Sequence, residues 1–354
     1  MSNHRIRKID LASRAVTVVA GCGSAALTDS VFGGFAKFYN PRGVALSPDE
    51  SFVLVADDGT HRIRQVVIGD PTQIVPGVCT TLAGSGTSSF GDGIRLGAGL
   101  RDPRDVAISH DGSFALFTDY SNHRIRVVTL ADPAQQASIT PGNTSTFAGK
   151  AHHGHYDLIG SDARFYHPHG IDISENGAFA LVADHNNHRI RHIDMTTREV
   201  STLAGQSSAG FKDATGTAAK LYYPRGVAIS PDNAFCLVAD QSNHRIRKVV
   251  TATKVVSTFA GSGSAGHRDA TGTSAQFYNP PGIAISYDGS FALVADSHTH
   301  RIRHINMATR AVTTLAGSGS AGFTDHTGGN ARFYYPHGVA ISNDGTFCLI
   351  ADQV

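Results

Sequence analysis

The sequence contains no tryptophan, only three methionines and four cysteines, and its charges nearly cancel. With 30 Lys and Arg against 29 Asp and Glu, the formal charge of +1 excludes a basic nucleic-acid arm and an acidic tail. No apolar run reaches the roughly 20 residues that span a bilayer, and the first residues lack a signal-peptide pattern. The cysteines lie far apart and form no Cys-x-x-Cys pair, so we expect no disulfide framework. These absences leave the compartment open.

The residues that are abundant point to one fold class. Hydrophobic residues make up 41% and charged residues 17% of the 354, which is enough apolar material for a packed core. The 38 glycines and 18 phenylalanines favour short strands joined by turns over long helices. No segment shows a sustained helical period, so we predict an all-β fold.

Internal repetition gives the architecture. The string His-Arg-Ile-Arg occurs six times, and each time an apolar run ending in Asp precedes it or, for the first string, closes the chain. One unit, from 223 to 258, contains four short β-rich runs separated by turn residues, which predicts a four-stranded antiparallel meander. Six such sheets bury both faces when they are arranged radially. The sequence therefore predicts a six-bladed β-propeller.

The unit boundaries predict how the ring closes. We expect a single domain over residues 1–354, with blades at about 40–84, 102–148, 167–204, 223–260, 279–316, and 335–354 together with 2–20. The two ends of the chain then share the sixth blade, which removes exposed sheet edges. A start in the middle of a unit is also what a piece of a longer protein with flanking domains would show.

The units resemble the NHL repeat family, whose signature is a Pro-x-Gly opening, an apolar strand ending in Asp, and Asn-His-Arg-Ile. The run Asn122 to Ile125 matches it fully, as do the runs at Asn187 and Asn243, whereas Thr60 and Thr299 replace the Asn in two units. The resemblance covers essentially the whole chain and implies a propeller that binds proteins or RNA. A related minority resembles enzymes, namely the peptidyl-hydroxyglycine amidating lyases and calcium-dependent lactonases.

Residues present in every unit are more typical of blade structure than of a single site. We therefore interpret the strand-final Asp and the first Arg of the string, such as Asp184 with Arg189, as partners in hydrogen bonds and ion pairs within a blade. A second repeated aspartate, in the long loops, is interpreted as a turn anchor, with calcium binding as the alternative. Its six copies are Asp29, Asp92, Asp157, Asp213, Asp269 and Asp325.

The middle residue of Pro-x-Gly varies between units and opens the innermost strand beside the central channel. Three arginines and two histidines around one mouth would attract a carboxylate, sulfate or phosphate. The alternative is that these side chains are solvated or paired with loop aspartates. The predicted ligand-binding residues are Arg42, Arg104, His169, Arg225 and His337, and Pro281 takes the remaining position.

The third unit departs furthest from the pattern. Asp172 stands where the other units carry Ala, and His167 and His169 flank Pro168. Imidazole and carboxylate groups suit zinc or another divalent metal, so His167, His169 and Asp172 are the candidate metal ligands. The amidating lyases place a zinc-ligating histidine in a Pro-His-Gly segment, which His169 and His337 match. The Pro-x-Gly positions supply no third histidine for such a site, and only Asp172 could correspond to the channel carboxylates of the lactonases.

These observations favour a noncatalytic scaffold that binds a protein, a peptide or another acidic ligand on the face with the long loops. The scaffold needs no cofactor, whereas the alternative, a metal-dependent lyase or hydrolase at the central channel mouth, needs zinc or calcium. Single-stranded RNA bound by the three arginines and nearby tyrosines is a third hypothesis, which the near-zero net charge disfavours. We expect a monomer that does not insert into membranes.

Overall fold

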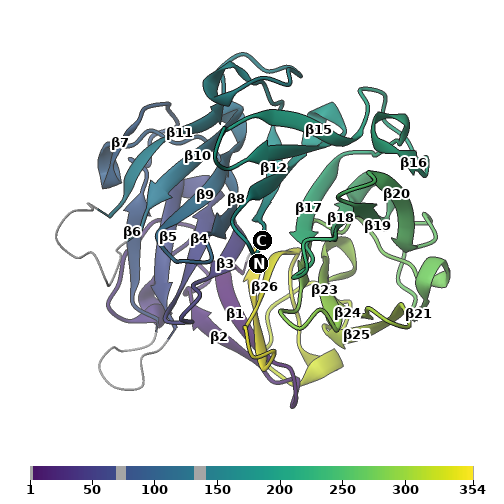
Figure 1. Ribbon diagram of the computed structural model, residues 1–354. Helices are drawn as coiled ribbons and strands as arrows, with labels where there is room; N and C mark the ends of the chain where they lie inside the picture. Colours follow the sequence, from purple (N-terminus) through teal and green to yellow (C-terminus); the bar gives the residue numbers. More distant parts are fainter. Residues whose placement is uncertain (1–2, 69–76, 131–140, 354) are drawn as a thin grey trace.

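The computed structural model describes residues 3–68, 77–130 and 141–353, which form six antiparallel sheets and short 3-10 segments without an α-helix. The sheets stand radially around a central channel (Figure 1). The all-β class, the six blades and the four-stranded antiparallel sheets are confirmed. No helix in the described residues is long and apolar enough to cross a membrane.

Sequence order within a blade is also spatial order from the channel outward in the first five blades. The strands of the first three blades are β3 (Pro41–Leu46), β4 (Phe52–Asp57), β5 (Arg62–Val67) and β6 (Cys79–Ala83), then β8 (Pro103–Ile108), β9 (Phe114–Asp119), β10 (Arg124–Thr129) and β11 (Asn143–Gly149), then β12 (Pro168–Ile173), β13 (Phe179–Asp184), β14 (Arg189–Asp194) and β15 (Val200–Gly205). Those of the next two are β17 (Pro224–Ile229), β18 (Phe235–Asp240), β19 (Arg245–Val250) and β20 (Val255–Ala260), then β22 (Gly282–Ile285), β23 (Phe291–Asp296), β24 (Arg301–Asn306) and β25 (Ala311–Ala316).

Three sheets gain a fifth strand of two residues from the long loop that precedes their own innermost strand. These short strands are β7 (Gly93–Ile94) on β11, β16 (Ala214–Thr215) on β20 and β21 (Ala270–Thr271) on β25. Each of them pairs with the outermost strand of its sheet. The long loops are therefore anchored to the rim of the propeller by backbone hydrogen bonds.

The sixth blade is shared by the two ends of the chain. Its inner strands are β26 (Pro336–Ile341) and β27 (Phe347–Asp352), and its outer strands are β1 (Arg5–Asp10) and β2 (Val16–Ala20). β1 pairs with β27 over six residues, from Arg5 opposite Asp352 to Asp10 opposite Phe347. The predicted ring closure is confirmed.

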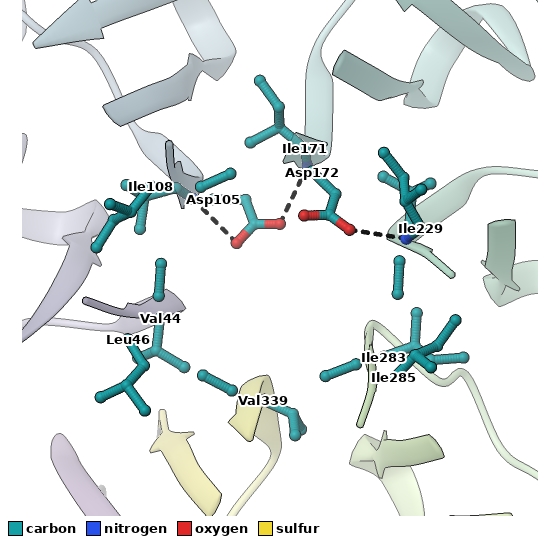
Figure 2. A pocket seen from close by; sticks show the side chains of 17 residues that line it. Val44, Leu46, Asp105, Ile108, Ile171, Asp172, Ile229, Ile283, Ile285 and Val339 are labelled. Carbon is teal, nitrogen blue, oxygen red and sulfur yellow. Dashed lines mark hydrogen bonds between the residues drawn. The ribbon is translucent and has the colours of Figure 1, made fainter. Parts of the chain in front are cut away.

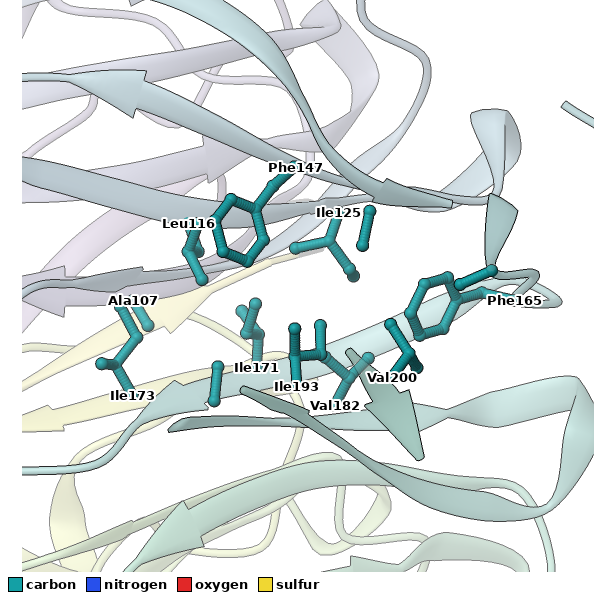
Figure 3. Packing of buried hydrophobic residues seen from close by; sticks show 13 residues of the cluster. Ala107, Leu116, Ile125, Phe147, Phe165, Ile171, Ile173, Val182, Ile193 and Val200 are labelled. Atoms are coloured by element: carbon teal, nitrogen blue, oxygen red, sulfur yellow. The ribbon is translucent and has the colours of Figure 1, made fainter. Parts of the chain in front are cut away.

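The hydrophobic core consists of six clusters, each formed mainly between neighbouring blades. Figure 3 shows one of them, where Leu116, Ile125 and Phe147 of the second blade face Ile171 and Val182 of the third. Phe165, from the long loop, fills the space between these sheets and is fully buried. Because no blade covers its own faces, the blades stabilise each other.

The long loops lie at one end of the propeller. In the first blade, Pro41 at the start of β3 pairs with Asp57 at the end of β4, and Asp57 pairs with Arg62 at the start of β5. Ile63 in turn pairs with Ala83, where the chain enters the next long loop. We call this end the long-loop face and the channel opening there the long-loop mouth.

A buried ion-pair network recurs in every blade, although with a different arginine from the one predicted. Asp184 is fully buried and accepts hydrogen bonds from the backbone amide of Tyr166, from Asn187 and, at 2.8 Å, from Arg191. Arg191 is also fully buried and reaches Asp157 at 2.5 Å and two backbone carbonyls. Arg189 instead donates to the carbonyl oxygen of Asn187.

The partner of the strand-final aspartate is thus the second arginine of the string, and the repeated loop aspartate is its other partner. The six fully buried arginines are Arg7, Arg64, Arg126, Arg191, Arg247 and Arg303. Each contacts one strand-final and one loop aspartate. These arginines attach the long loops to the blades.

The histidine of each string connects adjacent blades. His244, with a φ of 54°, lies in the left-handed region, and its Nδ1 accepts a hydrogen bond of 3.2 Å from the amide of Asn279 in the next unit. All six copies accept such a bond, which requires a neutral imidazole with its proton on Nε2. The histidine of the string therefore helps to hold neighbouring blades of the ring together.

Candidate functional site

The five predicted ligand-binding residues lie together at the long-loop mouth. Arg42, Arg104 and Arg225 come from the first residues of β3, β8 and β17, and His169 and His337 come from those of β12 and β26. Repetition explains this, because equivalent positions in six like blades meet at one level of the channel.

Two of the three arginines share one carboxylate. Arg42 donates through Nε to Oδ2 of Asp58 at 2.7 Å, and Arg104 donates through Nη1 to the same oxygen at 2.9 Å. Asp58 begins the 3-10 segment η2 (Asp58–Thr60) and is almost fully buried. The guanidinium of Arg104 also lies 4.3 Å from the centre of the Tyr120 ring. Pairing with a loop aspartate, the alternative raised by the sequence, thus applies to Arg42 and Arg104.

Arg225 has no such partner. No hydrogen bond or ion pair joins its side chain to another described residue, and its Nε is buried and unpaired. Burial, together with the charges of Arg42 and Arg104, lowers the pKa of Arg225 to about 9. The guanidinium remains charged at neutral pH, so the mouth holds a cation that forms no ion pair with any residue the structure describes.

The two histidines meet across the channel. Their blades are opposite in the ring, yet the rings of His169 and His337 stack with centroids 5.3 Å apart and an interplanar angle of 15°. Both residues are buried, at 3% and 4% exposure, and neither Nε2 has a hydrogen-bond partner among the described residues. Burial and the neighbouring arginines hold both pKa values well below the usual range, so both imidazoles are neutral.

The three candidate metal ligands do not converge. His167 stacks on Tyr120 at 4.3 Å, and its Nδ1 lies 3.0 Å from the side-chain nitrogen of Asn186. Asp172 lies further along the channel and accepts hydrogen bonds from the amides of Ile229 and Ile173. Within the described ranges, no three His, Cys, Asp or Glu side chains are placed to hold a metal ion. Metal binding by His167, His169 and Asp172 stays a prediction.

The channel below the mouth contains a second buried carboxyl group, which the sequence analysis missed. A cavity of about 220 Å³ is lined by apolar residues of all six innermost strands and by Asp105 and Asp172 (Figure 2). Asp105 accepts a hydrogen bond of 3.1 Å from the amide of Ile171 in the next blade. Burial raises the pKa of both carboxyl groups to about 7.

The signal for Asp105 was present in the sequence. The second unit reads Pro-Arg-Asp where the others have glycine as the third residue. Glycine is required there in other units because the innermost strands approach closely: a Cβ on Gly170 would collide with the carbonyl of Arg225. Asp105 and Asp172 each accept a hydrogen bond from a backbone amide of the next blade, and they thereby connect the second, third and fourth blades.

Replacing Asp172 with Ala, the residue of the other five units, is expected to change how stability depends on pH. A folded-state pKa of about 7, against about 3.9 in the unfolded chain, makes stability fall as pH rises from about 4 to 7. The Asp172→Ala variant should lose the contribution of this carboxyl group to the pH dependence of the free energy of unfolding. That contribution is at most about 1.4 kcal/mol per pH unit. Chemical denaturation at pH 5 and pH 8 measures the difference, with Asp172→Asn as the variant that keeps a hydrogen-bond acceptor. Parallel profiles for the wild type and both variants would contradict the assignment.

Comparison with known proteins places the repeats in a family. The NHL repeat model matches residues 165–193, which run from Phe165 into β14, the strand that follows the histidine of the fourth copy of the recurring string. The bovine and human proteins called NHL repeat-containing protein 2 are each 29% identical to this chain, over 285 and 277 residues. The chain therefore contains an NHL repeat and is similar to NHL repeat-containing proteins.

The curated relatives of this NHL-repeat propeller are longer than the chain. Protein SUPPRESSOR OF QUENCHING 1, chloroplastic, from Arabidopsis thaliana is 30% identical over 287 residues, which cover 77% of this chain and 25% of that protein. The bovine match covers 73% of this chain and 38% of the relative, and the human match covers 72% and 37%. The chain thus spans between a quarter and two fifths of the relatives' length.

Solved structures share the fold of the NHL-repeat propeller at low sequence identity. A structural genomics protein of unknown function from Bacteroides thetaiotaomicron superposes with a TM-score of 0.68 at 16% identity, covering 98% of this chain and 75% of the other. A chain of the nidogen/laminin complex gives a TM-score of 0.53 at 14% identity, covering 86% and 90%. These likenesses show the fold alone.

Proposed function

We propose that this NHL-repeat propeller is a noncatalytic binding scaffold that captures an acidic group of a protein or peptide at the long-loop mouth. The observation that carries the proposal is Arg225, a guanidinium without a counter-charge among the described residues. Arginine binds carboxylates through paired, charge-assisted hydrogen bonds, which suits it to an acidic ligand. The long loops surround the mouth and supply the surface that a larger partner would contact.

The rigidity of the site supports binding rather than a large rearrangement. The hydroxyl group of Thr118 donates a hydrogen bond of 2.6 Å to the carbonyl of His169 and thereby fixes the start of β12 relative to the second blade. The amide of Asp105 donates to the same hydroxyl oxygen at 3.0 Å. A site held in this way loses little conformational entropy when a ligand binds.

Arg225→Ala is expected to weaken the binding of a fluorescently labelled hexaglutamate peptide by about tenfold or more, because it removes the unpaired guanidinium. Fluorescence anisotropy at low salt measures the affinity, and a hexalysine peptide tests the sign of the charge. Arg268→Ala is the matched control, since Arg268 is exposed and, among the described residues, its side chain donates a hydrogen bond only to the carbonyl of Ser274. The melting temperature of Arg225→Ala should stay nearly unchanged.

Two outcomes would count against the proposal. Equal affinities of the wild type and Arg225→Ala would show that the mouth does not bind the acidic peptide. Tighter binding of an oligouridylate than of hexaglutamate, with a steep dependence on salt, would favour single-stranded RNA as the ligand.

A further inference from the structure

Asp58 occupies a place in the long-loop mouth that an acidic ligand would otherwise fill. Its Oδ2 accepts hydrogen bonds from Arg42 of the first blade and Arg104 of the second. The side-chain exposures of the ion pairs are low, at 16% for Arg42, 15% for Arg104 and 8% for Asp58. This is a partly desolvated carboxylate held by two guanidinium groups, which is the geometry expected for a bound acid.

The residue is specific to the first unit. Each strand-final aspartate is followed by one residue that opens the loop to the string, and this residue differs in all but two units: Asp58, Tyr120, His185, Gln241, Ser297 and Gln353. Only the first unit has a carboxylate there. Repetition therefore does not account for Asp58, in contrast to the strand-final aspartates, which the blade network uses.

Asp58 pairs with two of the three arginines at the mouth and leaves the third, Arg225, without a carboxylate partner among the described residues. Asp58 accepts hydrogen bonds from two of the three guanidinium groups, those of Arg42 and Arg104. Arg225 interacts unfavourably with those two arginines and has no partner of its own among the described residues. Behind the mouth, a cavity of about 30 Å³ is lined by Arg104, His169, His337 and the carboxyl of Asp105. That volume accommodates about one water molecule or one ligand oxygen.

We infer that Asp58 is a resident carboxylate that determines the specificity of the mouth, because it neutralises two arginines and leaves one subsite at Arg225 for a single acidic group. This inference rests on the proposed function. The accepted ligand is a small oxyanion group, a carboxylate or a sulfate, whose oxygen would receive hydrogen bonds from Arg225 and from an Nε2 proton of His169 or His337. Removing Asp58 opens a second subsite at Arg42 and Arg104.

The test uses inorganic sulfate as the probe and isothermal titration calorimetry as the measurement. Asp58→Asn is expected to bind sulfate about tenfold more tightly than the wild type, because Arg42 and Arg104 become available. Asp49→Asn is the matched control: it changes the net charge equally, but Asp49 is exposed in the turn between β3 and β4, at the end opposite the long-loop face. Sulfate should also raise the melting temperature of Asp58→Asn more than that of the wild type.

The double variant Asp58→Asn with Arg225→Ala separates the inference from the proposed function. In the wild-type background Arg225→Ala should abolish sulfate binding, whereas in the Asp58→Asn background binding should persist at Arg42 and Arg104. If Arg225→Ala weakens binding but Asp58→Asn binds no more tightly than Asp49→Asn, the inference is wrong and the proposed function stands. If neither the wild type nor Arg225→Ala binds sulfate or hexaglutamate, the proposed function itself is wrong, and the inference about Asp58 falls with it.

Discussion

Arg191→Ala is expected to lower the free energy of unfolding by about 3–5 kcal/mol, whereas Arg189→Ala should cost about 1 kcal/mol or less. Removing one partner of a buried ion pair leaves the other charge without compensation. Arg191 is fully buried and holds Asp184, which is also fully buried, and Asp157. Arg189 is partly exposed, and its one side-chain hydrogen bond to a described residue goes to the carbonyl of Asn187 within its own turn.

Urea denaturation of the two variants beside the wild type measures the contrast. The two arginines stand two residues apart in one strand, so Arg189→Ala controls for the loss of a charge and a long side chain at nearly the same place. A larger loss of stability in Arg189→Ala than in Arg191→Ala would show that the buried network is not what attaches the long loop to the blade.

Deleting residues 1–20 is expected to prevent stable folding, because the sixth blade would lose β1 and β2. The deletion removes four buried apolar side chains, Ile6, Ile9, Val16 and Ala20, from the clusters on both sides of that blade. Each of the larger three contributes about 1.5–3 kcal/mol. The deletion also removes Arg7, which pairs with Asp325 and with the buried Asp352. Together these losses approach the whole stability of a typical domain, about 5–15 kcal/mol.

The deletion also exposes the edge of β27 to pairing with other molecules, so we expect aggregation rather than a five-and-a-half-bladed monomer. Size-exclusion chromatography and far-ultraviolet circular dichroism report the outcome. The control is a circular permutant, in which a short linker joins the two ends and new ends lie in the loop between Ala260 and Gly282. It keeps every blade contact, and the amide of His4 already donates to the carbonyl of Gln353 at 3.2 Å. A folded, monomeric deletion variant would contradict the role of ring closure.

The placement of the candidate residues beside one mouth was predicted from the sequence, whereas their contacts across the channel depended on distances that the sequence does not give. The positions of Arg42, Arg104 and Arg225 beside one mouth follow from the repeat, since equivalent residues of like blades lie at one level. The contact between His169 and His337 does not follow from it, because their blades are opposite in the ring, and only the narrowness of the channel brings the rings to 5.3 Å.

The contacts of Asp105 and Asp58 with other blades likewise could not be predicted from the sequence. Asp105 was visible as a departure from glycine in the second unit, but its hydrogen bond to the third blade depends on how closely the innermost strands approach. Asp58 is one variable residue among six, and nothing in its neighbourhood along the chain indicates that arginines of two different blades converge on it.

By itself, the sequence determined the all-β class, the six blades and the closure of the ring by the two ends of the chain, because repeated turn and strand patterns are local and recur six times. The recurring string also indicated the likeness to NHL repeats, which a repeat model matches at residues 165–193. The tertiary structure decided which arginine of each string is buried, that Asp58 neutralises two of the three mouth arginines, and that Arg225 is left unpaired. Those outcomes depend on how side chains from separate blades share a narrow channel and the spaces between sheets, and no pattern within one unit specifies that geometry.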